Sequence, residues 1–170
     1  DTAQLCRVHA GLGDVYVLTG RYEEAIAACR AGLGRLRKGP KARATEEAQL
    51  RARSLAILCH RMGVAHERKA QYRQALELYR RGITSARGQD PHLEATLYLA
   101  MAGVLYREGR YAEAFGRCTR GVELARSAAS QDELAHGYYL LGNIYRDTGQ
   151  VEKAIEYRQR SLTIYGQTGN

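Results

Sequence analysis

The chain has 170 residues, a length that suits one domain or a short array of repeats. Hydrophobic residues make up 45% and charged residues 26% of it, which is ordinary globular composition and excludes an intrinsically disordered chain. The net charge is +8, but the 22 arginines are scattered among acidic residues, which favours a solvated surface over a face that binds nucleic acid.

The first half of the chain predicts two pairs of helices. The first pair turns at Gly20, where glycine can adopt the left-handed conformation that ends a helix. A loop around residues 38–41 follows. The segment 45–69 then predicts one long helix, whose first turn holds Glu46 and Glu47 and is therefore favoured by the helix dipole.

The second half predicts two further pairs. Asp90 followed by Pro91 indicates the start of a helix that ends near Glu108. The segment 130–133, Ser-Gln-Asp-Glu, is a capping box before a helix that runs to about residue 147. The last helix is expected over about 151–165. No segment alternates with period two, so we expect no strands.

Four glycines mark a repeated pattern. Each follows an apolar residue and precedes a turn, and an alanine lies on the helix after that turn. The marker glycines stand at intervals of 50, 40 and 39 residues: Gly13, Gly63, Gly103 and Gly142. Because the glycine and the alanine are both small, they allow the two helices of each hairpin to approach closely.

The pattern L-G-x-x-Y followed by G-x-Y-x-x-A resembles the tetratricopeptide repeat, and it covers about residues 2 to 166. The period of about 40 residues resembles the longer-helix variety of kinesin light chains, LGN-type adaptors and bacterial signalling ATPases. The resemblance implies an all-α fold, a right-handed superhelical solenoid of antiparallel helix hairpins. We expect one domain over 1–170, with repeats at about 2–38, 45–88, 91–128 and 131–166.

The resemblance also implies a concave groove lined by the first helix of each hairpin. Carried over by register, the peptide-binding residues form an apolar strip beside recurring arginines: Ile57, Arg61, Val64, Arg68, Leu97, Met101, Val104, Arg107, Tyr139, Asn143 and Arg146. Such a lining suits a partner with apolar and acidic residues. In the alternative interpretation the apolar residues pack on a neighbouring helix and the arginines are solvated.

We therefore expect a protein–protein interaction scaffold. The alternatives are a ligand-sensing regulatory module of a multidomain signalling ATPase or kinase and, less favoured, a nucleic-acid-binding helical repeat. We expect no enzyme and no cofactor, because the glycine-rich segments 11–13 and 32–34 follow no strand and no phosphate loop is complete.

Cysteine and histidine usage bears on location and on metals. The cysteines Cys6, Cys29, Cys59 and Cys118 have no metal or redox spacing, which predicts buried, reduced thiols. The five histidines form no ligand cluster, so we expect no metal site. The longest nearly apolar run, 95–106, is far shorter than the ~20 residues of a membrane span. We therefore expect a cytoplasmic protein, and the resemblance to bacterial signalling ATPases implies a bacterial one.

Both ends suggest a larger assembly. The chain begins at Asp1 without a methionine, and its last helix carries Ile155, Leu162, Ile164 and Tyr165 with no later helix to cover them. Repeat arrays normally close with a polar outer face. We therefore expect a fragment of a longer array, or end-to-end self-association through the uncapped last helix.

Overall fold

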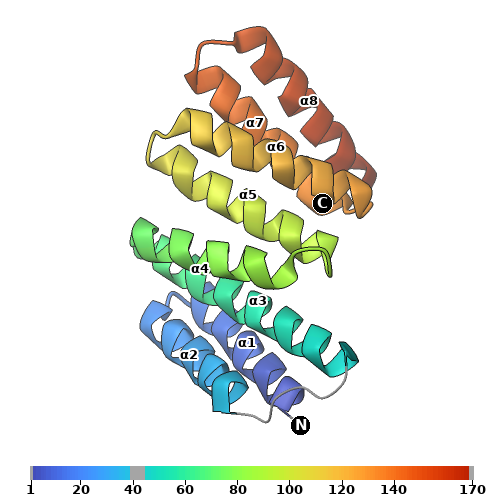
Figure 1. The fold of residues 1–170 in the computed structure, drawn as a ribbon. Helices are drawn as coiled ribbons and strands as arrows, with labels where there is room; N and C mark the ends of the chain where they lie inside the picture. Colours follow the sequence, from blue (N-terminus) through green and yellow to red (C-terminus); the bar gives the residue numbers. More distant parts are fainter. Residues whose placement is uncertain (1, 39–44, 169–170) are drawn as a thin grey trace. The chain divides into compact units, whose positions relative to one another are not determined.

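The computed structural model describes residues 2–38 and 45–168, and these residues form eight α-helices and no strand (Figure 1). The helices are α1 (Thr2–Leu18), α2 (Tyr22–Lys38), α3 (Thr45–Arg68), α4 (Tyr72–Ala86), α5 (Pro91–Arg107), α6 (Tyr111–Ser127), α7 (Gln131–Asp147) and α8 (Val151–Thr168). The prediction of an all-α chain of helix pairs is confirmed. The expected loop around 38–41 lies mostly outside the described residues.

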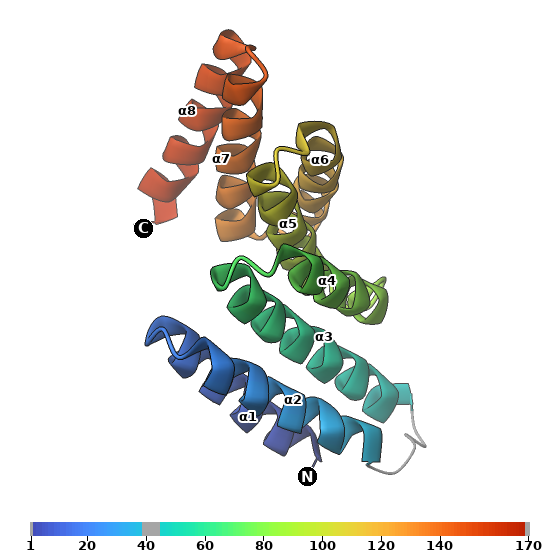
Figure 2. The same ribbon diagram turned by 90° about the vertical axis from the view of Figure 1, so that its left-hand side faces the viewer.

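The helices belong to two compact units, which we call unit 1 (Asp1–Asp90) and unit 2 (Pro91–Asn170). In unit 1, α1 pairs with α2 and α3 pairs with α4, while α3 packs against both helices of the first pair (Figures 1 and 2). Unit 2 has the same arrangement, with α7 packed against both α5 and α6. The fold is a tetratricopeptide-like repeat, whereas the single domain over 1–170 stays a prediction.

The turns inside the hairpins follow one backbone pattern. Gly20, Gly109 and Gly149 have φ of 74°, 72° and 79°, in the left-handed region that glycine adopts without strain. Ala70 takes the same place in the second hairpin, with φ 56°. After the first of these turns the amide of Arg21 donates to the carbonyl of the last helical turn at 2.8 Å. The predicted turn chemistry is confirmed.

Close helix contact at the marker position is confirmed in three hairpins. A Cβ added at Gly13, Gly63 or Gly142 would meet one equivalent residue of the second helix, at distances of 2.7, 2.8 and 3.0 Å respectively: Cys29 Sγ, Tyr79 Cδ1 and Arg158 Cγ. Side-chain carbons do not approach so closely without displacement. These glycines therefore set the spacing of the two helices.

The third hairpin corrects the sequence interpretation. A Cβ added at Gly103 would meet only the Arg107 guanidinium, at 3.9 Å. The fully buried Ala102 takes the marker position instead, since it lies twelve residues before Ala114, as Gly63 lies twelve before Ala75. The predicted register of α5 was therefore one residue out, because two adjacent small residues fit the pattern.

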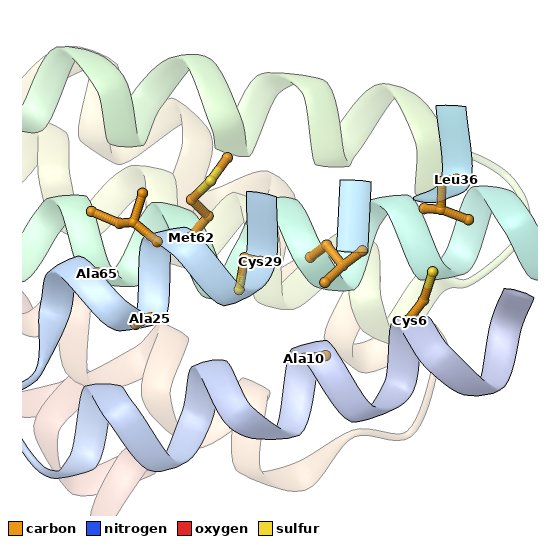
Figure 3. Close-up of a cluster of buried hydrophobic side chains, with 9 residues drawn as sticks. Cys6, Ala10, Ala25, Cys29, Leu36, Met62 and Ala65 are labelled. Atoms are coloured by element: carbon orange, nitrogen blue, oxygen red, sulfur yellow. The ribbon is translucent and has the colours of Figure 1, made fainter. Parts of the chain in front are cut away.

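The core of unit 1 lies between α1, α2 and α3 (Figure 3). It is built from small and sulfur-containing side chains together with a few leucines: Cys6, Ala10, Ala25, Ile26, Cys29, Leu36, Leu58, Met62 and Ala65. All four cysteines of the chain are buried and unpaired, as predicted. Burial raises the pKa of Cys29 to about 12 and that of Cys59 to about 11, which keeps both as neutral thiols.

Two buried side-chain hydrogen bonds link helices in unit 2. The Cys118 thiol donates to the Gly137 carbonyl at 3.3 Å, and the Ser161 hydroxyl donates to the Ala135 carbonyl at 2.8 Å. Helix α7 begins where the capping box predicts, but the Ser130 side chain does not cap it. Its hydroxyl lies 2.7 Å from His92 Nδ1 instead.

Candidate peptide-binding faces

Four predicted residues share one face of α3 in unit 1. Ile57, Arg61, Val64 and Arg68 follow one another at steps of four, three and four residues, which places them along one side of a helix. The first three are half-buried and Arg68 is exposed. We call this set the α3 face. It combines apolar side chains with cations on a surface that a partner can reach.

Helix α1 supplies an acid beside this face. Asp14 Oδ1 lies 2.8 Å from Arg61 Nε, and the two side chains are 40% and 38% exposed. Burial raises the pKa of Asp14, and the Arg61 charge opposes that rise. Arg61 is therefore already partnered, which leaves Arg68 as the more accessible cation for an acidic ligand.

His60 is next to Arg61 in α3. Its ring centroid lies 6.0 Å from that of Tyr79 in α4. Burial lowers the pKa of His60 to about 4, and the neighbouring Arg61 charge contributes. The imidazole is therefore neutral near pH 7, and it adds no charge to the α3 face.

Three predicted residues of α5 lie inside the protein. Leu97, Met101 and Val104 are 0%, 3% and 0% exposed, so they offer no surface in this structure, while Arg107 is exposed. The one-residue register error explains this difference. The half-buried positions of α5 that correspond to Ile57, Arg61 and Val64 are instead Thr96, Ala100 and Gly103.

The predicted residues of α7 are largely engaged already. Tyr139 is 44% exposed, and the Arg158 guanidinium of α8 lies over its ring at 4.6 Å. Arg158 also donates a hydrogen bond to Asn143 Oδ1, and Asn143 is only 8% exposed. The amide oxygen of Asn143 therefore already accepts one hydrogen bond within unit 2, which a peptide backbone would have to share or displace.

Arg146 is exposed but also has local partners. It donates to Asp147 Oδ1 at 2.7 Å and to the Tyr106 hydroxyl at 3.1 Å. The structure thus brings the predicted residues together as one face on α3 and as a second, engaged group on α7. Peptide binding by either group stays a prediction, and so does a groove that runs through both units.

Sequence reasoning missed the largest apolar surface of α1. Five exposed side chains recur at steps of three and four residues along it: Leu5, Val8, Leu12, Val15 and Leu18, with exposed fractions of 42, 55, 41, 55 and 86%. We call them the α1 stripe. The repeat register contains the missing signal, because Val8, Leu12 and Val15 correspond to buried residues of α3: Leu58, Met62 and Ala65.

The described residues were also compared with the requirements of a metal site and of a membrane-spanning helix. Within residues 2–38 and 45–168, no group of three or more His, Cys, Asp or Glu side chains is arranged to hold a metal ion. None of the helices formed by these residues is long and apolar enough to span a bilayer.

Family comparisons agree with the fold. Three family models, each described as a tetratricopeptide repeat, match residues 7–43, 58–91 and 93–167. The repeated hairpins and these matches together define the class, a helical-repeat protein. The chain belongs to the tetratricopeptide-repeat family. A comparison with curated protein sequences finds no match.

Solved structures show the same architecture. Aspartyl phosphate phosphatase F from Bacillus subtilis matches 100% of this chain over 42% of its own, at 13% identity and a TM-score of 0.83. The match to a putative kinesin light chain repeat protein from Podosopora anserina covers 99% of this chain and 78% of that protein. The sequence identity is 17% and the TM-score is 0.72. The match to a signal transduction ATPase with a tetratricopeptide repeat sensor, from Pyrococcus horikoshii, covers 97% of this chain and 24% of that protein. The sequence identity is 17% and the TM-score is 0.77.

These likenesses concern the fold alone, because the identities are low. The chain spans less than half the length of the phosphatase and about a quarter of the ATPase. The longer-repeat variety that the sequence suggested is represented among the matches by the kinesin light chain protein.

Proposed function

We propose that this chain is a protein–protein interaction scaffold that binds an extended peptide or a helix carrying apolar and acidic residues. The observation that supports this function is the α3 face, where Ile57 and Val64 alternate with Arg61 and Arg68 on one partly accessible side of the helix. A pre-ordered apolar strip beside cations can hold apolar anchors and pair with carboxylates. The partner supplies any chemistry.

A direct binding assay tests this function. The probe is a fluorescein-labelled peptide of alternating leucine and glutamate pairs, followed by fluorescence anisotropy. Arg68→Glu should weaken binding about tenfold or more, since it removes a charge-assisted hydrogen bond and adds repulsion. The matched control is Arg73→Glu, which changes an equally exposed arginine of α4 away from the α3 face. Equal losses in both variants would reduce the interaction to general charge attraction and end the proposal.

The same assay separates the rival classes of partner. A nucleic-acid-binding repeat would hold a labelled single-stranded oligonucleotide more tightly than the peptide, with a steep salt dependence. The exposed arginines do not favour that result, because several pair with acids three or four residues away in the sequence: Arg21, Arg110, Arg120 and Arg160. Placement in a cytoplasmic bacterial signalling protein is part of the proposal, and the fold likeness to a signal transduction ATPase with a tetratricopeptide repeat sensor motivates its signalling part alone.

End-to-end self-association is a second candidate function, and the α1 stripe favours it. In unit 1, Ile26 and Leu36 of α2 belong to one buried cluster with Leu58 and Met62 of α3. By register, the α1 stripe corresponds to that part of α3. On α8, Ile155 and Leu162 are 54% and 69% exposed, and Ile155 corresponds to Ile26 of α2. Helix α8 of one copy therefore has the right side chains to cover α1 of the next.

Sedimentation velocity at increasing protein concentration tests this second candidate. Such a contact joins two different surfaces, so it should build open chains rather than closed dimers. Val8→Glu and Leu162→Glu should each yield monomers. An equimolar mixture of the two should give a dimer and nothing larger, because one variant keeps α8 intact and the other keeps α1 intact.

The control for the mixture is Leu18→Glu. Leu18 ends the α1 stripe beyond the part that α8 would cover, because its register equivalents Arg68, Arg107 and Asp147 are all polar, whereas those of Val8, Leu12 and Val15 are buried. This variant should associate like the parent chain. A parent chain that stays monomeric at every concentration, or a mixture that stays monomeric, would contradict end-to-end docking without affecting the α3 face.

A further inference from the structure

Unit 1 contains a cavity of about 710 Å³ between α2, α3 and α4, away from the α3 face. Its floor is apolar and includes Leu33, Leu55 and Met62. On α3, Leu55 and Met62 are seven residues apart and so share one side of the helix. At 3.6 residues per turn, Ile57 and Val64 lie on the opposite side. The cavity and the α3 face are therefore separate surfaces of unit 1.

The wall of this cavity carries concentrated positive charge. Four arginines line it, and no acidic side chain does so among the described residues: Arg30, Arg37, Arg51 and Arg81. Arg51 donates a hydrogen bond from its guanidinium to the Leu36 carbonyl near the end of α2. Within the described part of the chain, Arg30, Arg37 and Arg81 have no ion-pair partner. Clustered guanidinium groups of this kind favour an anion.

In unit 2 the arginine equivalent to Arg81 lies against a pair of tyrosines. Cys59 and Leu78 of unit 1 correspond by register to Tyr138 and Tyr157 of unit 2, whose ring centroids lie 5.7 Å apart. The Arg160 guanidinium, equivalent to Arg81, lies over these rings at 5.9 and 5.3 Å.

A second arginine of unit 2 also contacts a tyrosine, whereas Arg30 and Arg51 correspond to Thr119 and Ser130. Arg126, equivalent to Arg37, donates to the Tyr138 hydroxyl at 3.0 Å. Where unit 1 has Gly34, unit 2 has Glu123, which accepts a hydrogen bond from Arg120 at 3.2 Å. Arg37 and Arg81 thus face an open cavity in unit 1, whereas their equivalents in unit 2 contact tyrosine side chains.

We propose that this cavity is a binding site for a small amphipathic anion, an alkyl chain that carries a carboxylate or a phosphate. The head group pairs with the arginines of the wall, and the chain lies on Leu33, Leu55 and Met62. The volume falls in the usual range of small-molecule sites, about 300–1,000 Å³. Guanidinium groups bind either head group through paired hydrogen bonds. This site is additional to the scaffold function and does not depend on it.

Isothermal titration calorimetry with three ligands of one chain length tests the site. Decanoate and decyl phosphate should both bind, and the tighter of the two identifies a free carboxylate or a phosphate as the head group. The uncharged 1-decanol should bind at least about tenfold more weakly, because it forms no charge-assisted hydrogen bond. Equal affinities for 1-decanol and for the anions would overturn the proposal. So would a cavity that binds the leucine–glutamate peptide and does not bind decanoate.

Two pairs of variants locate the site. Arg81→Glu should weaken binding of the better anion about tenfold or more, whereas Arg120→Glu at the equivalent place in α6 should leave it unchanged. Gly34→Leu should weaken binding of the better anion about tenfold or more, because its side chain takes up part of the cavity. A Cβ at Gly34 meets nothing within 4 Å, so this variant keeps the fold even where Arg81→Glu does not.

The control for the filled cavity is Gly116→Leu, a helical glycine of α6 with equally open surroundings. It should bind the anion like the parent chain. Unchanged affinity in Gly34→Leu, or equal losses in Gly34→Leu and Gly116→Leu, would place the anion elsewhere and refute the site. Peptide binding at the α3 face should persist in Gly34→Leu, which separates the two proposals.

Discussion

Replacing Gly63 by alanine should destabilise unit 1, although alanine is the better helix former. The new methyl group would lie 2.8 Å from Tyr79 Cδ1 and 3.0 Å from Cζ. The Tyr79 ring is 0% exposed and its hydroxyl donates to Glu67 Oε2 at 2.7 Å, so it cannot move aside freely. The ring, its hydrogen bond and the α3–α4 spacing must all adjust.

The size of the effect follows from three contributions. Overpacking of a filled core costs about 1–3 kcal/mol. A weakened Tyr79–Glu67 hydrogen bond adds about 1 kcal/mol. The gain in helix propensity from glycine to alanine offsets about 1 kcal/mol. We therefore expect Gly63→Ala to lower the free energy of unfolding by about 1–3 kcal/mol.

Two other glycines provide the comparison. A Cβ at Gly11 meets nothing within 4 Å, and one at Gly103 meets only Arg107 at 3.9 Å. Gly11→Ala and Gly103→Ala should therefore each stabilise the protein by about 0.5–1 kcal/mol, the propensity gain alone. The second variant also tests the register correction in α5, because a glycine at a true marker position would not tolerate alanine.

Urea unfolding followed by circular dichroism measures these changes. Because repeat proteins can unfold in more than one step, hydrogen exchange of the α3 and α4 amides isolates unit 1. A Tyr79→Leu background should remove most of the loss caused by Gly63→Ala. Equal stability of Gly63→Ala and Gly11→Ala, or a loss that persists without the tyrosine ring, would refute the packing argument.

Three further predictions follow from the described environments. The pKa of His60 falls from 6.5 in the unfolded chain to about 4 in the folded protein, so its contribution to stability is complete above pH 6.5 and is lost as the pH falls towards 4. The loss is about 3 kcal/mol at most, and His60→Gln should flatten that part of a stability profile measured by urea unfolding at successive pH values. Burial raises the pKa of Cys29 and of Cys118 to about 12. Ellman's reagent should therefore label these two thiols of the folded chain only as fast as the surrounding helices open. Rapid labelling of both thiols without urea would contradict their burial. Ala70→Gly should raise the free energy of unfolding by about 0.5–1 kcal/mol, since φ at Ala70 is 56°. A lower midpoint temperature of thermal unfolding in Ala70→Gly than in the parent chain would show that the alanine side chain, rather than the turn backbone, stabilises this hairpin.

The helices, their turns and the repeat family were all predictable from the sequence, because local chemistry specifies them. Glycine at positions 20, 109 and 149 marks a left-handed residue wherever it occurs, and apolar periodicity of three and four residues gives helices without reference to other segments. Sequence repetition then supplied the family, since equivalent residues recur at a fixed spacing.

The candidate site was less predictable, because it depends on contacts between helices. Spacing alone placed Ile57, Val64 and Arg68 on one face of α3, but it could not show that Asp14 neutralises Arg61. The partner of Asn143 was also hidden, since Arg158 lies on a different helix.

The sequence by itself determined how many hairpins form and where each one turns, because those features depend on neighbours within a few residues. Tertiary structure alone decided which of two adjacent small residues, Ala102 or Gly103, contacts the facing helix, because both satisfy the same local pattern and only packing distinguishes them. It also decided that arginines with aromatic partners in unit 2 line an open cavity in unit 1, since a cavity depends on what the facing helices leave unfilled.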